Sequence, residues 1–378
     1  MNKHQLIQLS TVHPRNDIRI FVKQVQTLHA ALDADVALVV ADGLGDSLGT
    51  GSANVHDLGK LPESRLLRAI HGNKRAFDFI RRTKPRLVHF HDPELIPLGL
   101  VLRVFGHEVI YDVHEDVPRQ IMSKHWIPVV LRWPVAKAIS AMEWLAGRFF
   151  NGIVPATSTI AARFPLERTV IVQNFPIQSE LVLATPQPYN QRPQAFAYVG
   201  ALTDIRGVKG MVQALDHLKD RPDAHLEIAG AISPAGLAAE LRELSSWSRV
   251  RYRQSLNRSE VAQLLGGARG GLVLFHPMPN HIDAQPNKMF EYMSAGLPVV
   301  ASDFPLWREI IDGAKCGLLV DPLDPKAIAD AMRWILDHPE QAEAMGRNGQ
   351  AAVRNKYNWD RESKTLIDFY RTLLKSKN

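Results

Sequence analysis

Cysteine is almost absent from this chain of 378 residues, which has one, Cys316. A single thiol excludes a disulfide framework and a thiolate metal site within one chain, and it is typical of a reducing compartment. No apolar run approaches the roughly 20 residues that cross a bilayer. The opening segment MNKHQLIQLS has too short an apolar run for a signal peptide. We therefore expect a cytoplasmic protein that meets a membrane only from its surface.

Low-complexity tracts and short repeats are also missing, and the overall composition is that of a soluble globular protein. Apolar residues make up 46% of the chain, which is long enough for two domains. The formal charge of +6 favours an anionic partner: a phosphate-bearing substrate, an acidic membrane surface or nucleic acid. Charge alone does not choose among these three.

Short apolar runs that alternate with helical patterns predict the fold. Strands between helices indicate βαβ units and parallel sheets. We expect strands at 6–10, 35–40, 53–59, 86–92, 108–115, 152–157 and 169–174, and then at 196–202, 225–230, 250–255, 271–277, 298–303 and 317–321. So many strands favour two doubly wound α/β domains. A single (β/α)8 barrel is the alternative, but it needs no break in the middle of the chain.

Such a break is present in the segment PIQSELVLATPQPYNQRPQ, residues 176–194, which is rich in proline and glutamine and has no periodicity. It predicts a linker. The expected organisation is a first domain at 1–175, the linker at 176–194 and a second domain at 195–355.

The stretch QPNKMFEYMSAGLPVVASD, residues 285–303, predicts a ligand site in the second domain. Doubly wound sheets bind ligands beyond the carboxyl ends of their strands, often against helix N-termini. We expect Asn287 to cap a helix whose first turn, beginning with Lys288, offers free N–H groups to a phosphate. Glu291 lies one turn in, where its carboxylate suits two adjacent hydroxyls, as on a ribose. The alternative is that Glu291 only favours the positive end of the helix.

The segment HIDAQPNKMFEYMSAGLPVVASDFPLWREIIDGAKCGLLVDPLD resembles the donor-binding signature of glycosyltransferase family 4, whose members are retaining enzymes of GT-B fold. That fold has two Rossmann-like domains facing a central cleft. The signature is an acid, seven residues and a second acid, here Asp283 and Glu291. The family usually has glutamate at both positions. The resemblance implies that Glu291 holds the nucleotide ribose and that Asp283 faces the donor sugar.

The similarity continues through Glu309 to the terminal segment YNWDRESKTLIDFYRTLL. It implies that Glu309 belongs to the donor site. It also implies that a last helix, within 356–378, crosses back onto the first domain.

A second donor motif of the family places an arginine and, five residues later, a lysine after the first strand of this domain. Here VGALTDIRGVKG has Ala201 and Arg206 at these positions. The first cation is absent, so the resemblance assigns the diphosphate to Arg206, with Gly200 beside it and Lys209 one turn on. A diphosphate leaving group needs positive compensation.

The first half has its own polar cluster. His89 and His91 share one face at a strand end, and His114 follows the next strand beside Asp112. Such a set leaves open a metal site, as in metal-dependent hydrolases of barrel fold. These segments, with STVHPRNDIRIFVKQVQTL, also resemble the acceptor domain of one branch of family 4. The resemblance implies that His114 approaches the donor sugar and that His91, Asp92, Asp17 and Arg19 lie on the acceptor side.

Basic residues and tryptophans are interleaved in residues 117–150, and Glu143 is the only acidic residue of this segment. Such a segment can lie at an anionic bilayer surface. The alternative is a pair of core helices with solvated cations. Nucleic acid is not expected, because no strand carries interleaved stacking aromatics.

Together these features predict a retaining hexosyltransferase of polysaccharide biosynthesis. It would use a UDP- or GDP-sugar and a glycan or polyprenyl-diphosphate-linked acceptor, with His114, Asp283 and Arg206 as catalytic residues. No metal or other cofactor is expected, and the enzyme would be cytoplasmic, with peripheral contact at the inner face of the plasma membrane. The alternatives are a nucleotide-sugar epimerase or hydrolase of the same fold and a non-catalytic binding protein.

Overall fold

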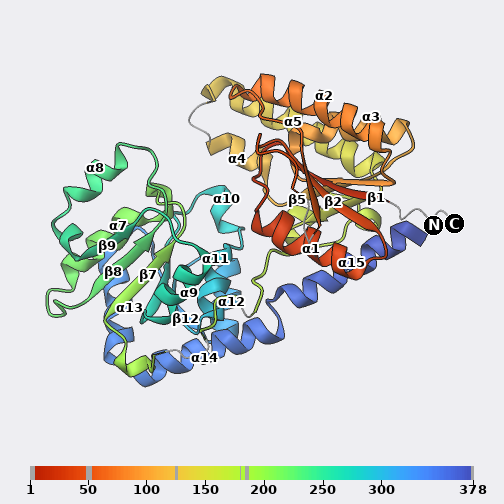
Figure 1. The fold of residues 1–378 in the computed structure, drawn as a ribbon. Helices are drawn as coiled ribbons and strands as arrows, with labels where there is room; N and C mark the ends of the chain where they lie inside the picture. The colour runs from red at the N-terminus through yellow and green to blue at the C-terminus, as the bar shows by residue number, and fades with distance from the viewer. Residues whose placement is uncertain (1–4, 48–52, 124–126, 179, 184–186, 376–378) are drawn as a thin grey trace. The chain divides into compact units, whose positions relative to one another are not determined.

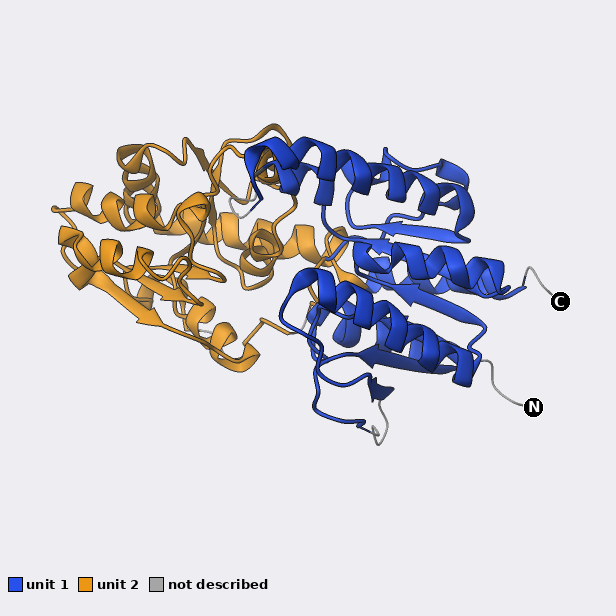
Figure 2. Cartoon of the chain, turned by 90° about the horizontal axis from the view of Figure 1, so that it is seen from above, with its two compact units in different colours: residues 1–174, 360–378 blue, residues 175–359 orange. Residues whose placement is uncertain are grey.

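The computed structural model describes residues 5–47, 53–123, 127–178, 180–183 and 187–375 (Figure 1). The chain forms two compact units: residues 1–174 and 360–378 make unit 1, and residues 175–359 make unit 2 (Figure 2). The segment 176–194, predicted to be a linker, is thus part of unit 2. Each unit contains one six-stranded sheet.

The sheet of unit 1 is parallel and has the strand order β3-β2-β1-β4-β5-β6. Its strands are β1 (Gln5–Leu9), β2 (Asp35–Val40), β3 (Asn54–Asp57), β4 (Leu87–Phe90), β5 (Glu108–Val113) and β6 (Gly152–Pro155). In register, Leu6 of β1 lies opposite Val36 of β2 and Leu87 of β4. Every residue of β4 and β5 is buried, as expected for parallel strands packed on both faces.

Helices connect these strands. They are the π-helix η1 (Ile18–Val25) and α1 (Gln26–Ala31), α2 (Arg65–Thr83), the 3-10 turn η2 (Pro93–Leu95), α3 (Ile96–Val104), α4 (Val117–Ser123), α5 (Val129–Phe149), α6 (Ser158–Ala161) and the 3-10 turn η3 (Leu166–Arg168). Asp17 begins η1, because its side chain accepts a hydrogen bond from the N–H of Ile20.

The C-terminal helix α15 (Trp359–Lys375) packs on unit 1. The hydroxyl of Tyr370 lies 2.7 Å from Nδ1 of His89, and Glu362 accepts a hydrogen bond from the N–H of Gln173. Gly152 of β6 leaves room for this helix, since a Cβ there would lie 2.2 Å from the ring of Phe369. The last helix is therefore an integral part of the unit that begins the chain.

Unit 2 has a parallel sheet of order β12-β11-β10-β7-β8-β9. Its strands are β7 (Ala195–Val199), β8 (His225–Ala229), β9 (Val250–Arg253), β10 (Gly270–Val273), β11 (Val299–Ser302) and β12 (Gly317–Val320). Its helices include α7 (Val208–Ala214), α8 (Leu237–Arg242), α9 (Arg258–Gly266), α10 (Pro279–Ile282), α11 (Asn287–Ser294), α12 (Pro305–Ala314), α13 (Pro325–Asp337) and α14 (Pro339–Asn355), and the 3-10 turns are η4 (Tyr189–Gln191), η5 (Asp204–Arg206), η6 (Leu215–His217) and η7 (Ser245–Arg249).

The strand predicted at 169–174 is wrong, although the segment does lie beside β6. Val170 and Val172 donate hydrogen bonds to the carbonyls of Ile153 and Pro155, and Thr169 forms an isolated bridge. The carbonyl of Val172, however, accepts from the guanidinium of Arg19, and the N–H of Gln173 donates to Glu362. Side chains take the backbone groups that a ladder would need, so the apolar run TVIVQN remains irregular.

Both sheets follow the doubly wound order. Successive strands are first added on one side of the first strand and then on its other side. In unit 1 this switch point lies between β1 and β4, and in unit 2 it lies between β7 and β10. Ligands of such sheets bind outside the carboxyl ends of the strands at the switch point. The loops after these four strands are therefore the places to look for a site.

Candidate functional site

In unit 2 the loops that follow β7 and β10 are tied together. The N–H of His276, after β10, donates to the carbonyl of Ile205, after β7. Gly207 has φ +79°, and a Cβ at this position would lie 2.0 Å from the carbonyl oxygen of Leu274. Only glycine permits this close approach. The contact brings the predicted donor residues of both loops to one place.

Lys288 and Arg206 meet there over the same aromatic ring. The ammonium of Lys288 lies 5.0 Å from the ring centre of Phe275, and the guanidinium of Arg206 lies 5.5 Å from it. Lys288 is also 5.0 Å from the ring of Tyr198. Gly200 borders this pair, since a Cβ added to it would lie 3.1 Å from Nζ of Lys288. Two cations thus border the same ring at the switch point.

The position of Lys288 changes its ionisation. Burial, reinforced by the neighbouring charge of Arg206, lowers the pKa of Lys288 to about 7, although the carboxylate of Glu291 acts in the opposite direction. A buried cation next to a second cation is costly until an anion joins them. The pair is therefore suited to receive a diphosphate.

We expect the affinity for a nucleoside diphosphate such as UDP to fall as the pH rises from 7 to 9. Binding of the anion favours protonated Lys288, so above a pKa of about 7 the protein must take up a proton to bind. The dissociation constant then rises by up to about tenfold per pH unit. The terminal phosphate ionises near pH 6, below this window. Calorimetric titrations at several pH values measure the effect.

The variant Lys288→Arg is the control for this pH dependence. A guanidinium stays charged throughout the range, so its affinity for UDP should change little between pH 7 and 9. An equal pH dependence in Lys288→Arg and the parent protein would contradict the assignment to Lys288.

Glu291 lies in the second turn of α11, and one of its oxygens is engaged. Oε1 accepts a hydrogen bond of 2.9 Å from Nη1 of Arg258.

The predicted cap at the start of α11 is wrong. Pro286 occupies the N-cap position, and Asn287 is the first helical residue, because the fixed φ of proline already sets the entry of the chain. Asn287 is exposed, and the first N–H groups of the helix have no side-chain cap.

The remaining predicted donor residues are spread more widely. Asp283 follows α10 and is half-buried, and Glu309 lies exposed on α12. Lys209, on α7, forms ion pairs with Glu240 and Asp204. A diphosphate contact from Lys209 would compete with these carboxylates. The structure thus brings Gly200, Arg206 and Lys288 together most closely.

In unit 1 the three predicted histidines surround one buried carboxylate, that of Asp112. Oδ1 of Asp112 lies 3.1 Å from Nδ1 of His114 and 3.7 Å from Nδ1 of His91, and Oδ2 lies 3.8 Å from Nε2 of His89. The rings of His89 and His91 are stacked, which confirms that they share one face of the strand end. A proton on Nδ1 of His114 leaves its Nε2 as an acceptor.

Arg19 provides the counter-charge for Asp112. Its Nε and Nη2 donate to the two oxygens at 3.0 and 2.9 Å, and Gln24 donates to Oδ2 at 2.7 Å. Burial opposes ionisation, but Arg19, followed by His114 and His91, holds the pKa of Asp112 well below its usual range. Arg19 is itself buried. A direct acceptor contact by Arg19 would require this ion pair to open.

His89, His91 and Asp112 also lie close enough together to hold a metal ion. Arg19, Gln24 and His114 already direct donors to both oxygens of this carboxylate. A metal ion would have to displace the guanidinium. The cluster is therefore better suited to orient His114 than to bind a cation.

A pocket of about 600 Å³ lies next to this cluster. Its polar part includes His13, His91, Asp92, His114 and Glu115. Asp92 is held in place by Thr11, whose N–H donates to Oδ2 at 2.6 Å, and by the hydroxyl of Ser10. Asp17 lies next to the pocket through His13, at 3.5 Å. The apolar part comes from α4, α5 and the segment between them: Val117, Ile121, Ile127, Pro128, Leu131, Val135 and Ile139.

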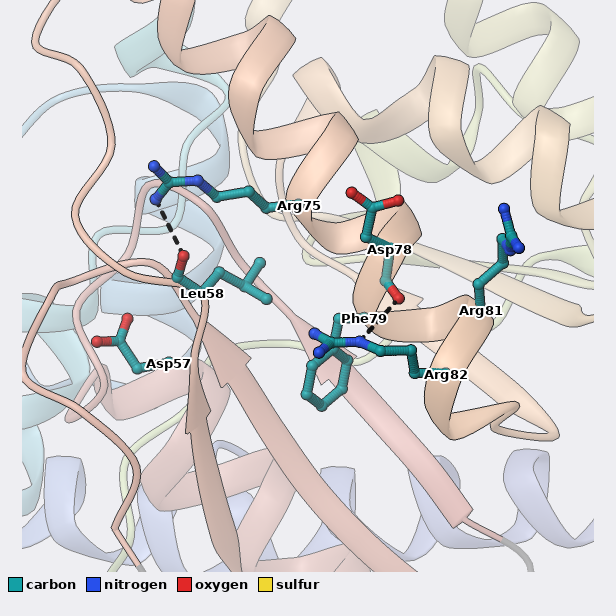
Figure 3. Close-up of a pocket in the computed structure, with 7 residues that line it drawn as sticks. All are labelled: Asp57, Leu58, Arg75, Asp78, Phe79, Arg81 and Arg82. Atoms are coloured by element: carbon teal, nitrogen blue, oxygen red, sulfur yellow. Dashed lines mark hydrogen bonds between the residues drawn. The ribbon is translucent and has the colours of Figure 1, made fainter.

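Another pocket of unit 1, of about 680 Å³, lies between β3 and α2 (Figure 3). The guanidinium of Arg75 donates hydrogen bonds to the carbonyls of Leu58, Gly59 and Lys60. Arg82 donates to the carbonyl of Asp78 on its own helix. These cations stabilise the local backbone, and the lining contains none of the predicted site residues.

Comparison of the folded chain with solved structures settles its architecture. Sucrose-phosphate synthase from Thermosynechococcus elongatus superposes with a TM-score of 0.78 over 98% of this chain and 99% of that one, at 17% identity. HepE of Anabaena, solved in complex with UDP-glucose, gives 0.72 over 98% and 100%, at 12% identity. The fold is GT-B. These identities establish the fold alone.

Sequence comparison points the same way. The family model for group 1 glycosyl transferases matches residues 185–352, a range that includes every predicted donor residue. An MMP α-(1→4)-mannosyltransferase from Mycolicibacterium hassiacum is 22% identical over 319 residues, which cover 81% of this chain and 73% of that protein. These matches support membership of the GT-B glycosyltransferase superfamily and an activity in sugar transfer.

Sequence reasoning missed several residues of the site. Arg258, which holds Glu291, and Phe275 and Tyr198, which border Lys288, were not predicted. The one local signal was that Arg258 follows Asn257 in the capping box with Glu260, which places it at the start of a helix. Its carboxylate partners lie 78 and 33 residues away in the chain. No local pattern connects residues so far apart.

Proposed function

We propose that this protein is a retaining hexosyltransferase that uses a UDP- or GDP-sugar and acts in polysaccharide biosynthesis. The observation that carries the proposal is the pair of cations, Arg206 and Lys288, at the switch point of unit 2. Lys288 lies one helical turn before Glu291 on α11. A diphosphate would bind between the cations and the first N–H groups of α11, which have no side-chain cap. Glu291 would take the ribose hydroxyls, and Asp283 would face the sugar.

The reaction follows from this charge arrangement. The bond between the sugar carbon and the diphosphate breaks, and the cations stabilise the negative charge that develops on the leaving oxygen. The acceptor hydroxyl forms the new bond on the same face of the sugar, and its proton passes to the departing phosphate. Configuration is then retained without a protein nucleophile. Arg206, Lys288 and helix N–H groups supply the positive charge, so we propose that no metal ion or other cofactor takes part.

The pocket beside Asp112 is the proposed acceptor site. Carboxylates and imidazoles at its polar end suit sugar hydroxyls, which both donate and accept hydrogen bonds. Its apolar end, formed by α4 and α5, suits a hydrocarbon group. The acceptor is accordingly a glycan or a polyprenyl-diphosphate-linked saccharide, with His114 as the proposed catalytic residue of unit 1 and His91, Asp92 and Asp17 on the acceptor side.

A thermal-shift screen against UDP-, GDP- and ADP-sugars tests the proposal. A ligand that binds only the folded state at 100 times its dissociation constant adds about 2.7 kcal/mol of stability. The matching sugar nucleotide should raise Tm, and product should form only after acceptor is added, with or without a chelator. Rapid turnover of the donor alone would indicate a hydrolase or epimerase, and binding without turnover a non-catalytic protein.

Peripheral membrane contact is the second part of the proposal. Among the described residues, no helix combines the length and apolarity that crossing a bilayer demands. On α5, however, the exposed residues Val130, Trp133, Lys137, Ala141, Trp144 and Arg148 recur at helical spacing and form one outer stripe. Trp133 and Trp144 are 63% and 67% exposed. Lys124 and Trp126, which contributed to the sequence prediction, lie outside the described residues.

Such a stripe is suited to the inner face of the plasma membrane, where anionic lipids attract cations and tryptophan enters the interface. We expect the double variant Lys137→Gln/Arg148→Gln to float less with anionic liposomes. Each cation contributes on the order of 1 kcal/mol, so the partition coefficient should fall by about 30-fold. The matched control, Arg347→Gln/Arg354→Gln on α14, loses the same charge. Equal losses in both variants would contradict a specific surface on α5.

A further inference from the structure

Arg258 connects two carboxylates in unit 2. Its Nε and Nη2 donate to the two oxygens of Glu180 at 2.6 and 2.8 Å, and its Nη1 donates to Oε1 of Glu291 at 2.9 Å. All three side chains are partly shielded from solvent, with exposed fractions of 33% for Arg258, 20% for Glu180 and 17% for Glu291. The guanidinium therefore serves both acids at once.

The backbone of Arg258 is held firmly. Arg258 is the first residue of α9, directly after Asn257, which accepts from the N–H of Glu260 at 3.0 Å. Glu260 in turn accepts from the N–H of Asn257 at 2.7 Å. This capping box anchors the helix start. The two-pronged pair with Glu180 then sets the direction of the guanidinium, because a bidentate contact allows little rotation.

The geometry points to Arg258 as the residue that positions Glu291 for the ribose. This inference rests on the proposed function. A glutamate side chain has three rotatable bonds, and its ordering costs free energy when a ligand binds. Arg258 holds Oε1 before the nucleotide arrives, while no hydrogen bond joins Oε2 to the described part of the chain. Oε2, together with the second lone pair of Oε1, can accept the ribose hydroxyls.

Glu180 has a separate part in this arrangement. Without it, the full charge of Arg258 would act on Glu291 alone, and the pair that faces the ribose would have no net charge. With two carboxylates on one guanidinium, the group keeps a net charge of −1. Charged acceptors form hydrogen bonds roughly twice as strong as neutral ones. The pair with Glu180 thus leaves Glu291 a strong acceptor.

A ligand without the ribose hydroxyls separates positioning from general support of the fold. We would measure the affinities of UDP and GDP, and of their 2′,3′-dideoxy forms, for the parent protein, Arg258→Gln and Arg258→Lys. If Arg258 acts through Glu291, Arg258→Gln should bind the matching diphosphate about tenfold more weakly and the dideoxy form unchanged. Arg258→Lys, which keeps the charge but not the fork, should lie between the two.

Arg251→Gln is the matched control, because Arg251 also pairs with a glutamate of unit 2, Glu227, but is 65% exposed and lies on β9. It should leave both affinities unchanged. Equal weakening of the ribose and dideoxy forms in the Arg258 variants would overturn the inference and leave the donor site intact. An unchanged UDP or GDP affinity in Arg258→Lys and Arg258→Gln would overturn it as well. A parent protein that binds neither diphosphate would overturn the proposed function itself.

Discussion

Replacing Arg206 with alanine is expected to lower kcat by about 10²- to 10³-fold, the loss found when a single donor to a developing oxyanion is removed. The cation lies 5.5 Å from the ring of Phe275, beside Lys288, where the diphosphate is proposed to bind. Charge on the leaving oxygen grows as the sugar departs, so the transition state depends on Arg206 more than the bound donor does. The KM for the donor should change much less than kcat.

The effect should be large because Ala201 stands at the position where the resemblance to glycosyltransferase family 4 implies an arginine. Arg206 is then the cation that this motif supplies to the diphosphate. Steady-state kinetics with the sugar nucleotide found in the screen measure the loss. Arg347→Ala provides the control, since Arg347 is 63% exposed on α14 and pairs only with Glu343 on its own helix among the described residues. A decrease in kcat no greater than that of Arg347→Ala would refute the role of Arg206.

Replacing Glu291 with alanine is expected to weaken nucleoside diphosphate binding by about 10- to 100-fold. A hydrogen bond to a charged group contributes about 1.5–3 kcal/mol, and each 1.4 kcal/mol is a factor of ten in affinity. The substitution also leaves Arg258 with one carboxylate, Glu180, instead of two. Calorimetry with UDP or GDP measures the loss.

Two comparisons make the Glu291 result specific. The 2′,3′-dideoxy nucleotide, which has no hydroxyls for the carboxylate, should bind Glu291→Ala and the parent protein equally. Glu340→Ala, an exposed acid in the first turn of α14, should not alter nucleotide affinity. If Glu291→Ala bound the full nucleotide as tightly as the parent protein, the ribose assignment would fail.

The sequence predicted most elements because each strand is a local apolar run. The run DVALVV predicted a strand at 35–40, and β2 has these bounds. Parallel strands packed on both faces show continuous apolar residues, which a single sequence reveals. The irregular segment at 169–174, TVIVQN, is also rich in β-branched residues, which favour strands. There Arg19 and Glu362, which are distant in sequence, take the backbone groups that a strand would use.

Of the candidate site, the sequence by itself determined which candidate residues follow strand ends or begin helices, because local periodicity places those elements. Their proposed roles came from the helix start at Lys288 and Glu291, and from the family resemblance for Arg206, His91 and His114. Only the tertiary structure decided what these residues meet. The pKa of Lys288 depends on burial among Tyr198, Phe275 and Arg206. The orientation of the Glu291 side chain depends on a hydrogen bond from Arg258, 33 residues earlier in the chain. Desolvation and charge pairing are set by distances in space, and packing of the whole unit determines those distances.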